Sequence, residues 1–172
     1  MFFLLTFFLT YITLTFLYQE YLKSFGENKL DGITQFVGEN TKHVMHLFDK
    51  SATIEESLLE PYIKLFYSHK YVARIIEGCN AISVIILFVA FIVAFSGKIK
   101  PTLFFIFGGS ILIYILNIFR IAILCVLMFS YPNQKQFFHS VLFPLFIYGV
   151  VFILWLIWVN KFSRYASKTT KE

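Results

Sequence analysis

Cys79, Arg120 and His139 are the residues whose types and placement could do chemistry, because each stands inside or at the edge of a long apolar stretch. An ionisable residue at membrane depth costs about 2.5 to 3.5 kcal/mol on insertion scales, so its presence indicates a function. A cysteine can act as a nucleophile, an arginine can hold negative charge, and a histidine can transfer a proton. The three together predict a reactive site.

The elements that must position these residues are predicted to be membrane-spanning helices. Each apolar stretch approaches the about 20 residues needed to cross a hydrocarbon core about 30 Å thick, and 58% of the chain is hydrophobic. We therefore predict an all-α polytopic membrane protein, with about four transmembrane helices and an external helical segment between the first and the second. The stretches without Asp, Glu, Lys or Arg are residues 1–19, 78–97, 101–119 and 136–160.

The basic residues predict how these spans are oriented. The turn between the second and third spans carries Lys98 and Lys100, and the tail after the fourth span is also basic. Both connections are expected in the cytoplasm, so residues 20–77 and the turn at 131–138 are expected outside. Much of the net charge of +5 lies in this inner collar, which argues against nucleic-acid binding.

The chain is predicted to divide into four parts. Residues 1–17 have no basic region ahead of them and no small-residue cleavage site behind them, so we expect a retained anchor and not a cleaved signal peptide. The predicted parts are a transmembrane anchor at 1–18, an external helical segment at 19–77, a three-helix catalytic membrane core at 78–163 and a basic cytoplasmic tail at 164–172.

The external segment is predicted to form short amphipathic helices on the membrane surface. Apolar residues recur at mostly helical spacing over residues 30–48. Thr53 and Glu56 fit a capping box ahead of a helix at 54–60. Residues 62–76 are expected to lead from there toward the second span.

The three reactive residues are expected at one height in the membrane. Cys79 and His139 open the second and fourth spans from the outside. Arg120 comes about 19 residues after Pro101, which is about 28 Å along a helix that enters from the cytoplasm. All three therefore reach the outer interface. Beyond Arg120, residues 121–129 either extend the helix outward or bend back along the surface.

Cys79 is the expected nucleophile. A thiol in the first turn of a helix faces the positive end of the helix dipole, which favours the thiolate, and Arg120 would act in the same direction. The dipole argument requires the helix to break at Gly78, and it lapses if residues 62–76 run unbroken into the span. His139 is the candidate proton shuttle, although the dipole at a helix start disfavours its protonated form.

Other polar residues are candidates to support this site. Free N–H groups around Asn80 and Ala81 could stabilise an oxyanion as a carbonyl is attacked. Asn117 is expected either to hold Arg120 or to pack between helices. Glu77 precedes the Gly-Cys pair, so it either pairs with Arg120 or sits in interfacial water.

The residues around these positions resemble the exosortase/archaeosortase family of membrane transpeptidases, most closely the compact exosortase F form of the Bacteroidetes type. The matching features are a cysteine at the head of one span, the Asn117-Ile118-Phe119-Arg120 stretch in the next, and a histidine at the head of the last. The resemblance covers essentially the whole chain and is most specific at residues 76–83, 117–124 and 139–158. Asn80, Ala81 and Phe143 depart from the pattern, which often has small residues or glycine there.

The resemblance implies a cysteine protease or transpeptidase in which Cys79 is the nucleophile and Arg120 and His139 complete the site. Its substrates would be exported proteins with a C-terminal sorting signal made of a short motif, a transmembrane helix and a basic tail. Cleavage would pass through a thioester to an amine acceptor or to water, on the periplasmic side of the bacterial inner membrane. We expect no cofactor.

Each of these residues also has a simpler interpretation. Cys125 is interpreted as a small buried hydrophobic residue, although a disulfide to Cys79 is an alternative in an oxidising compartment. Arg120 could merely mark the outer end of its span by snorkelling. His43 and His46 are interpreted as part of a solvated helix face, because no further well-spaced ligand supports a metal site.

A second hypothesis belongs to a different functional class. It describes a non-enzymatic membrane assembly or transport subunit that uses Arg120 to bind an anionic headgroup or a carboxylate of a partner. The two hypotheses make opposite predictions for Cys79, because only the enzyme needs its sulfur.

Overall fold

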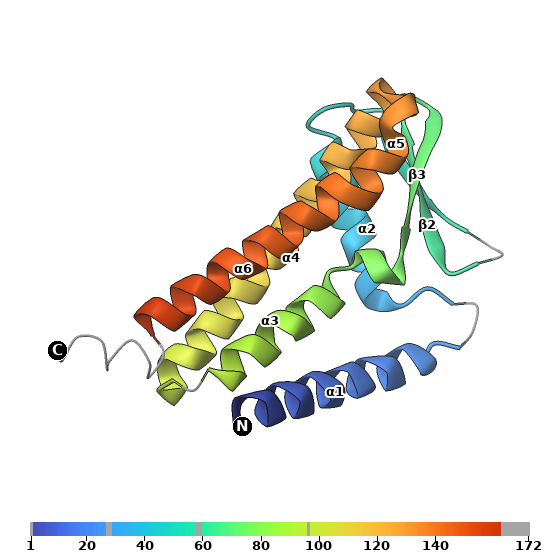
Figure 1. Ribbon diagram of the computed structural model, residues 1–172. Coiled ribbons are helices and arrows are strands. Elements are labelled where there is room, and N and C mark those ends of the chain that lie inside the picture. The colour runs from blue at the N-terminus through green and yellow to red at the C-terminus, as the bar shows by residue number, and fades with distance from the viewer. Residues whose placement is uncertain (1, 27–28, 58–59, 96, 163–172) are drawn as a thin grey trace.

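The computed structural model describes residues 2–26, 29–57, 60–95 and 97–162. Helices lie side by side in an elongated bundle, and a small sheet stands at one end of it (Figure 1). The helices are α1 (Phe2–Lys23), α2 (Gly32–Met45), α3 (Ile82–Ala94), α4 (Ile99–Ser130), α5 (Lys135–Phe137) and α6 (Phe143–Lys161). The strands are β1 (Thr53–Glu56), β2 (Tyr62–Tyr67) and β3 (Lys70–Ile76), and the short helical turns are η1 (Glu77–Cys79), η2 (Pro132–Gln134) and η3 (Phe138–Leu142).

Three helical stretches in the described residues are long and apolar enough to cross a membrane, namely Phe3–Lys23, Ile99–Ser130 and Pro132–Lys161. The expected second span, residues 78–97, corresponds to α3, which has only 13 residues. At 1.5 Å per residue it extends about 20 Å, well short of a hydrocarbon core about 30 Å thick. The count of four full spans is therefore not reached. The predicted basic tail at 164–172 lies outside the described residues.

The all-α prediction was wrong for the segment between α2 and α3, where a three-stranded antiparallel sheet has the order β1-β2-β3. The expected helix after Thr53 is strand β1, and residues 62–76 form a hairpin instead of a helical approach to the next span. Ser68 and His69 have positive φ of 50° and 60°, which suits a tight hairpin turn. Alternating burial in β2 fits a half-buried strand.

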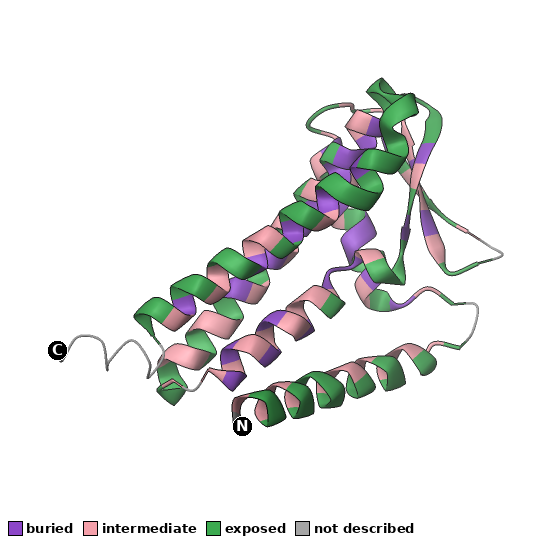
Figure 2. Ribbon diagram, viewed as in Figure 1, coloured by how far each residue is buried: buried purple, intermediate pink, exposed green. Residues whose placement is uncertain are grey.

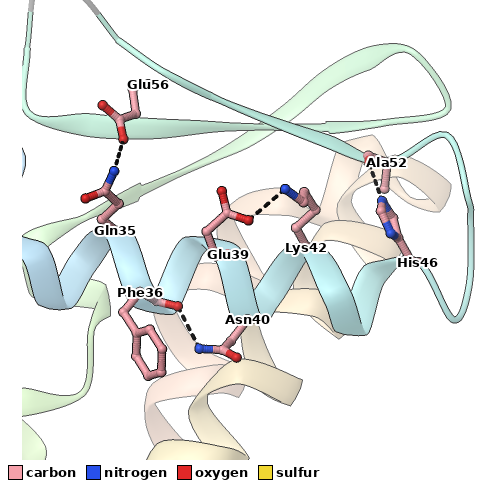
Figure 3. Close-up of polar contacts among 8 residues, drawn as sticks. All are labelled: Gln35, Phe36, Glu39, Asn40, Lys42, His46, Ala52 and Glu56. Atoms are coloured by element: carbon pink, nitrogen blue, oxygen red, sulfur yellow. Dashed lines mark hydrogen bonds and ion pairs between the residues drawn. The ribbon is translucent and has the colours of Figure 1, made fainter.

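Helix α2 covers the middle of the residue range expected to be helical and packs beside the sheet. Asp31 caps its first turn by accepting hydrogen bonds from the N–H groups of Ile33 and Thr34. Figure 3 shows how its polar face is held: Gln35 Nε2 donates to Glu56 Oε1 on β1 at 2.7 Å, and a ring nitrogen of His46 lies 2.8 Å from the carbonyl oxygen of Ala52. The histidine thus ties the helix end to the following loop.

After Arg120 the chain continues as helix α4 without a break to Ser130. Residues 121–129 therefore extend the helix and do not bend back along the surface. Its C-terminal part packs on α2, β2 and β3. A single apolar core joins these elements, with Ile63 and Leu65 from the sheet against Ile121 and Cys125 from the helix. Buried residues lie along this contact and also along α3, whereas α1 is exposed over most of its surface (Figure 2). The part of α4 after Arg120 therefore supports the sheet by packing against it.

Trp158, near the end of α6, is fully buried. Its Nε1 donates to the carbonyl oxygen of Phe95 at 3.0 Å, and its ring packs on Phe105. This tryptophan closes the corner between α3, α4 and α6, so its function is packing.

Replacing Gly109 by alanine is expected to destabilise the fold by about 1 to 3 kcal/mol, because the added Cβ would overlap the buried ring of Phe88 and lie 2.7 Å from its Cε1. The neighbouring Gly108 is the matched control, since a Cβ there meets nothing within 4 Å. Alanine at Gly108 should be neutral or stabilise the helix by up to about 1 kcal/mol. Thermal unfolding in detergent measures both changes, and equal midpoints for the two variants would contradict this account.

Asp49 is expected to make the stability of the sheet end depend on pH. Its carboxylate accepts hydrogen bonds from the N–H and Oγ of Ser51 and from the N–H of Ser68, which hold the pKa of Asp49 below its usual range. A lowered folded-state pKa stabilises the fold above the unfolded-state pKa, and this contribution is lost as the pH falls through the folded-state value. Thermal midpoints measured from about pH 6 to about pH 2.5 should fall less in Asp49→Asn than in the parent chain. Glu55→Gln on β1, an exposed carboxylate, should leave the parent profile unchanged.

Candidate active site

A cavity of about 580 Å³ lies between β3, the C-terminal part of α4 and the turn that leads into α6. Cys79, Arg120 and His139 all line it, each from a different element. The structure thus brings together the three residues that the sequence analysis selected. Their catalytic roles stay predictions.

Cys79 ends the 3₁₀ turn η1, so the chain does break beside Gly78 before α3 begins at Ile82. Ala81 turns the chain into the helix with a left-handed φ of 68°. The half-buried cysteine therefore precedes the helix and does not lie in its first turn. The dipole argument for the thiolate is correspondingly weaker than expected, because the effect falls off beyond the terminal turn.

Asn80 supports this turn and does not present a free oxyanion donor. Its main-chain N–H donates to the carbonyl oxygen of Glu77 at 3.3 Å. Its buried side chain accepts from the N–H of Ile82 at 3.1 Å and donates to the Tyr18 hydroxyl at 2.7 Å and to Thr34 Oγ1 at 3.2 Å. These bonds tie the cysteine turn to α1 and α2. They account for an asparagine where the family pattern often has a smaller residue.

Asn117 connects the nucleophile candidate to the arginine. It is fully buried, and its Nδ2 donates to the carbonyl oxygen of Cys79 at 2.8 Å. Its Oδ1 accepts from Arg120 Nη1 at 3.2 Å, one helical turn along α4. Both alternatives for Asn117 therefore hold at once, since it contacts Arg120 and also joins two elements. A buried amide with both ends bonded fixes the orientation of its partners.

Arg120 keeps one buried donor unused. Its Nε is buried and has no hydrogen-bond partner among the described residues. The guanidinium lies within electrostatic range of the Cys79 sulfur and the Tyr148 hydroxyl. Glu77 is exposed, does not line the cavity and forms no ion pair with Arg120 in the described part of the chain. An unpaired guanidinium donor at a cavity is suited to bind an anion or an oxyanion.

His139 lies within a π-helical turn, η3, and not at a helix start as expected. Helical structure begins earlier, at Pro132, so the dipole penalty on a protonated His139 is smaller than the sequence analysis assumed. Pro144 follows at the start of α6 and has no N–H for the carbonyl of Ser140, which favours a widened turn here. The ring of His139 is exposed at the cavity, and widened turns of this kind are frequent at functional sites.

Cys125 does not belong to this site. It is fully buried in the apolar core that α4 shares with the sheet, and it does not line the cavity. Both cysteines are free thiols. The simpler interpretation of Cys125 therefore agrees with its position.

A family model described as transmembrane exosortase matches residues 1–159 of the chain. The chain belongs to this family. Comparisons with curated proteins and with solved structures gave no significant match. Membership agrees with the membrane-length apolar helices, so the chain is a multi-pass membrane protein of the transmembrane exosortase family.

Sequence reasoning missed the part of the exosortase cavity that the sheet contributes. Tyr71 and Arg74 of β3 line it, and Lys135 closes it by donating to the carbonyl oxygen of Val72 at 3.0 Å. The available signal was the period-2 alternation of residues 62–67, which indicates a strand and not a helix. The pairing of a lysine with a distant carbonyl had no signal in the sequence.

Proposed function

We propose that the chain is a membrane-embedded cysteine transpeptidase or protease of the exosortase F, Bacteroidetes-type form. It cleaves the C-terminal sorting signal of exported proteins in the bacterial inner membrane, with its active site on the periplasmic side. The observation that carries this proposal is the single cavity that Cys79, Arg120 and His139 share. The orientation rests on the basic residues at Lys98 and Lys100, which are expected in the cytoplasm.

In the proposed reaction, the Cys79 thiolate attacks the carbonyl carbon of the scissile peptide bond. The carbon–sulfur bond forms as the carbon–nitrogen bond breaks, and His139 delivers a proton to the leaving amine. Arg120, whose guanidinium lines the same cavity, first stabilises the thiolate and then the oxyanion. An acceptor amine or water then attacks the thioester and gives a proton to His139, the carbon–sulfur bond breaks, and the thiolate is regenerated.

Asn117 and Asn80 support these groups without touching the reacting atoms. Asn117 holds the Cys79 main chain and the guanidinium in one arrangement. Asn80 anchors the same turn to α1 and α2. Holding reactants in a fixed geometry lowers the barrier that orientation would otherwise impose.

Trapping the acyl group tests this proposal directly. Acid-quenched membranes from cells that make the full-length chain and its exported substrates should contain a Cys79 peptide joined to a substrate fragment. Hydroxylamine should release that fragment, because it cleaves thioesters. The Cys125→Ala chain should give the same adduct. Attachment of the fragment to a different residue would contradict the proposal. Continued processing without a thioester adduct at Cys79 would contradict it as well.

A second candidate is a non-enzymatic assembly or transport subunit, which the unused donor of Arg120 favours. A guanidinium with an unpaired buried N–H could bind an anionic headgroup or a partner carboxylate. This candidate gives no role to the sulfur of Cys79. The variants described in the Discussion separate the two.

A further inference from the structure

Strand β3 forms a free edge of the sheet along the candidate active site. The strand order β1-β2-β3 gives it one neighbour, β2. Ala73, Arg74 and Ile75 all line the cavity. Successive side chains of a strand point to opposite faces, so three consecutive lining residues indicate that the cavity runs along this edge, and Leu65 of β2 shows that it also reaches one face of the sheet.

The main-chain N–H and C=O groups of Arg74 point away from β2. Two observations indicate this orientation. The carbonyl of Val72 accepts from Lys135, so it faces outward, and the N–H two residues later in a strand faces the same side. Independently, Ser57 N–H donates to Tyr62 O, so Tyr62 faces β1. The alternation along β2 then directs Leu65 toward its partner Ala73, which leaves the next residue of β3 facing outward.

The part of this edge that lies nearest Cys79 is unoccupied, whereas the part at Val72 is occupied. Lys135 occupies the carbonyl of Val72, which lies at the β-bulge where the register of β2 and β3 shifts. From Ala73 to Ile76 no main-chain hydrogen bond to an element other than β2 is found in the described part of the chain. At about 3.3 Å per residue this stretch can pair with about four residues, and the strand then runs directly into η1 and Cys79.

The chemistry of the edge favours a peptide as its occupant. Outward N–H and C=O groups are satisfied by another extended chain, which is how strands are added to open sheets. A lipid tail has no such groups. The charged side chains that line the cavity are Arg74, Arg120 and Lys135, and none is acidic. This charge argues against a lysine-rich or arginine-rich segment as the occupant.

We propose that the substrate segment beside the scissile bond binds as an added strand on the free edge of β3, with its main chain paired to Arg74. This inference rests on the proposed function. Main-chain pairing holds the peptide extended and directs one of its carbonyls at the cysteine turn. Side chains of the substrate then contribute less than its main chain to affinity at these positions.

The test compares Arg74→Pro with Arg74→Ala in the full-length chain in cell membranes. Proline removes the outward N–H, whereas alanine keeps it and removes only the side chain. The readout is the processing of those exported proteins that accumulate uncleaved in Cys79→Ala cells. We expect at least about tenfold slower processing for Arg74→Pro and less than about threefold for Arg74→Ala. Glu56→Pro on the opposite edge is the control for general damage to the sheet.

Normal processing by Arg74→Pro would overturn the proposal. Equal losses in the two Arg74 variants would also overturn it, because they assign the effect to side-chain charge, as expected for a phosphate headgroup. If Arg74→Pro lowers membrane abundance, an α-hydroxy acid is placed at position 74 instead, which replaces the main-chain N–H by an oxygen atom. Slowed processing by this variant supports the proposal, and unchanged processing overturns it. If substrates are still cleaved in Cys79→Ala cells, the proposed function itself is refuted. If cleavage is blocked in Cys79→Ala cells but normal with Arg74→Pro, only the proposal of an added substrate strand is refuted.

Discussion

Replacing Cys79 by alanine is expected to abolish processing of exported substrates, with a loss of at least about 10³-fold. The thioester needs a sulfur nucleophile, and the cavity offers no second cysteine. The fold should be unaffected, because the contact that holds this turn, Asn117 Nδ2 to the Cys79 carbonyl, involves only the main chain of the cysteine. The measurement is the fraction of uncleaved substrate in the membrane by quantitative mass spectrometry, with the abundance of the chain measured in the same samples.

Cys125→Ala is the matched control for this substitution. The same side-chain change then falls in a buried core, outside the cavity. We expect full processing and a stability loss of about 1 kcal/mol. Full processing by Cys79→Ala would leave only the non-enzymatic subunit as a candidate.

Replacing Arg120 by lysine is expected to slow processing by about 10²-fold although the positive charge is kept. Lysine lacks the planar fork that lets Nη1 reach Asn117 Oδ1 while the rest of the guanidinium lies at the cavity. The buried amide of Asn117 then loses a partner, and the turn that carries Cys79 loses its fixed relation to the positive charge. Single-turnover cleavage rates in membrane vesicles measure the loss, because they separate chemistry from substrate release.

Arg74→Lys makes the same exchange at the other arginine that lines the cavity. Its side chain is exposed, and its ion pair with Glu60 is long at 3.9 Å, so we expect less than about threefold change. A binding subunit that uses Arg120 only as a point charge would tolerate lysine there as well. Equal, small effects at both arginines would therefore favour the binding candidate over the enzyme.

The longest helices were predictable because their signal is local. A run of about 20 apolar residues needs no tertiary context to be read as a membrane span, and α4 and α6 arise from such runs. The family was also predictable, since its pattern depends on residue types at Cys79, Arg120 and His139. The model match over residues 1–159 confirms the family.

The sheet was not predicted because its strands are short and its stabilisation is not local. Residues 62–76 contain enough apolar residues to fit a helix, and the capping-box pattern at Thr53 suggested one. Pairing between β2 and β3, and packing of Ile63 and Leu65 against α4, select the strand instead. The apolar length around α3 likewise overstated its helix, because η1 and a left-handed Ala81 delay the start of the helix to Ile82.

By itself the amino-acid sequence determined the long apolar helices, the family and the three residues selected for chemistry, since each depends on residue type and spacing along the chain. Tertiary structure decided what surrounds those residues. The bond of Asn117 to Cys79, the bond of Lys135 to Val72 and the edge of β3 along the cavity all depend on contacts between segments far apart in sequence. Such contacts form only when the chain has folded, because no local pattern encodes which distant carbonyl a buried amide or a lysine will meet.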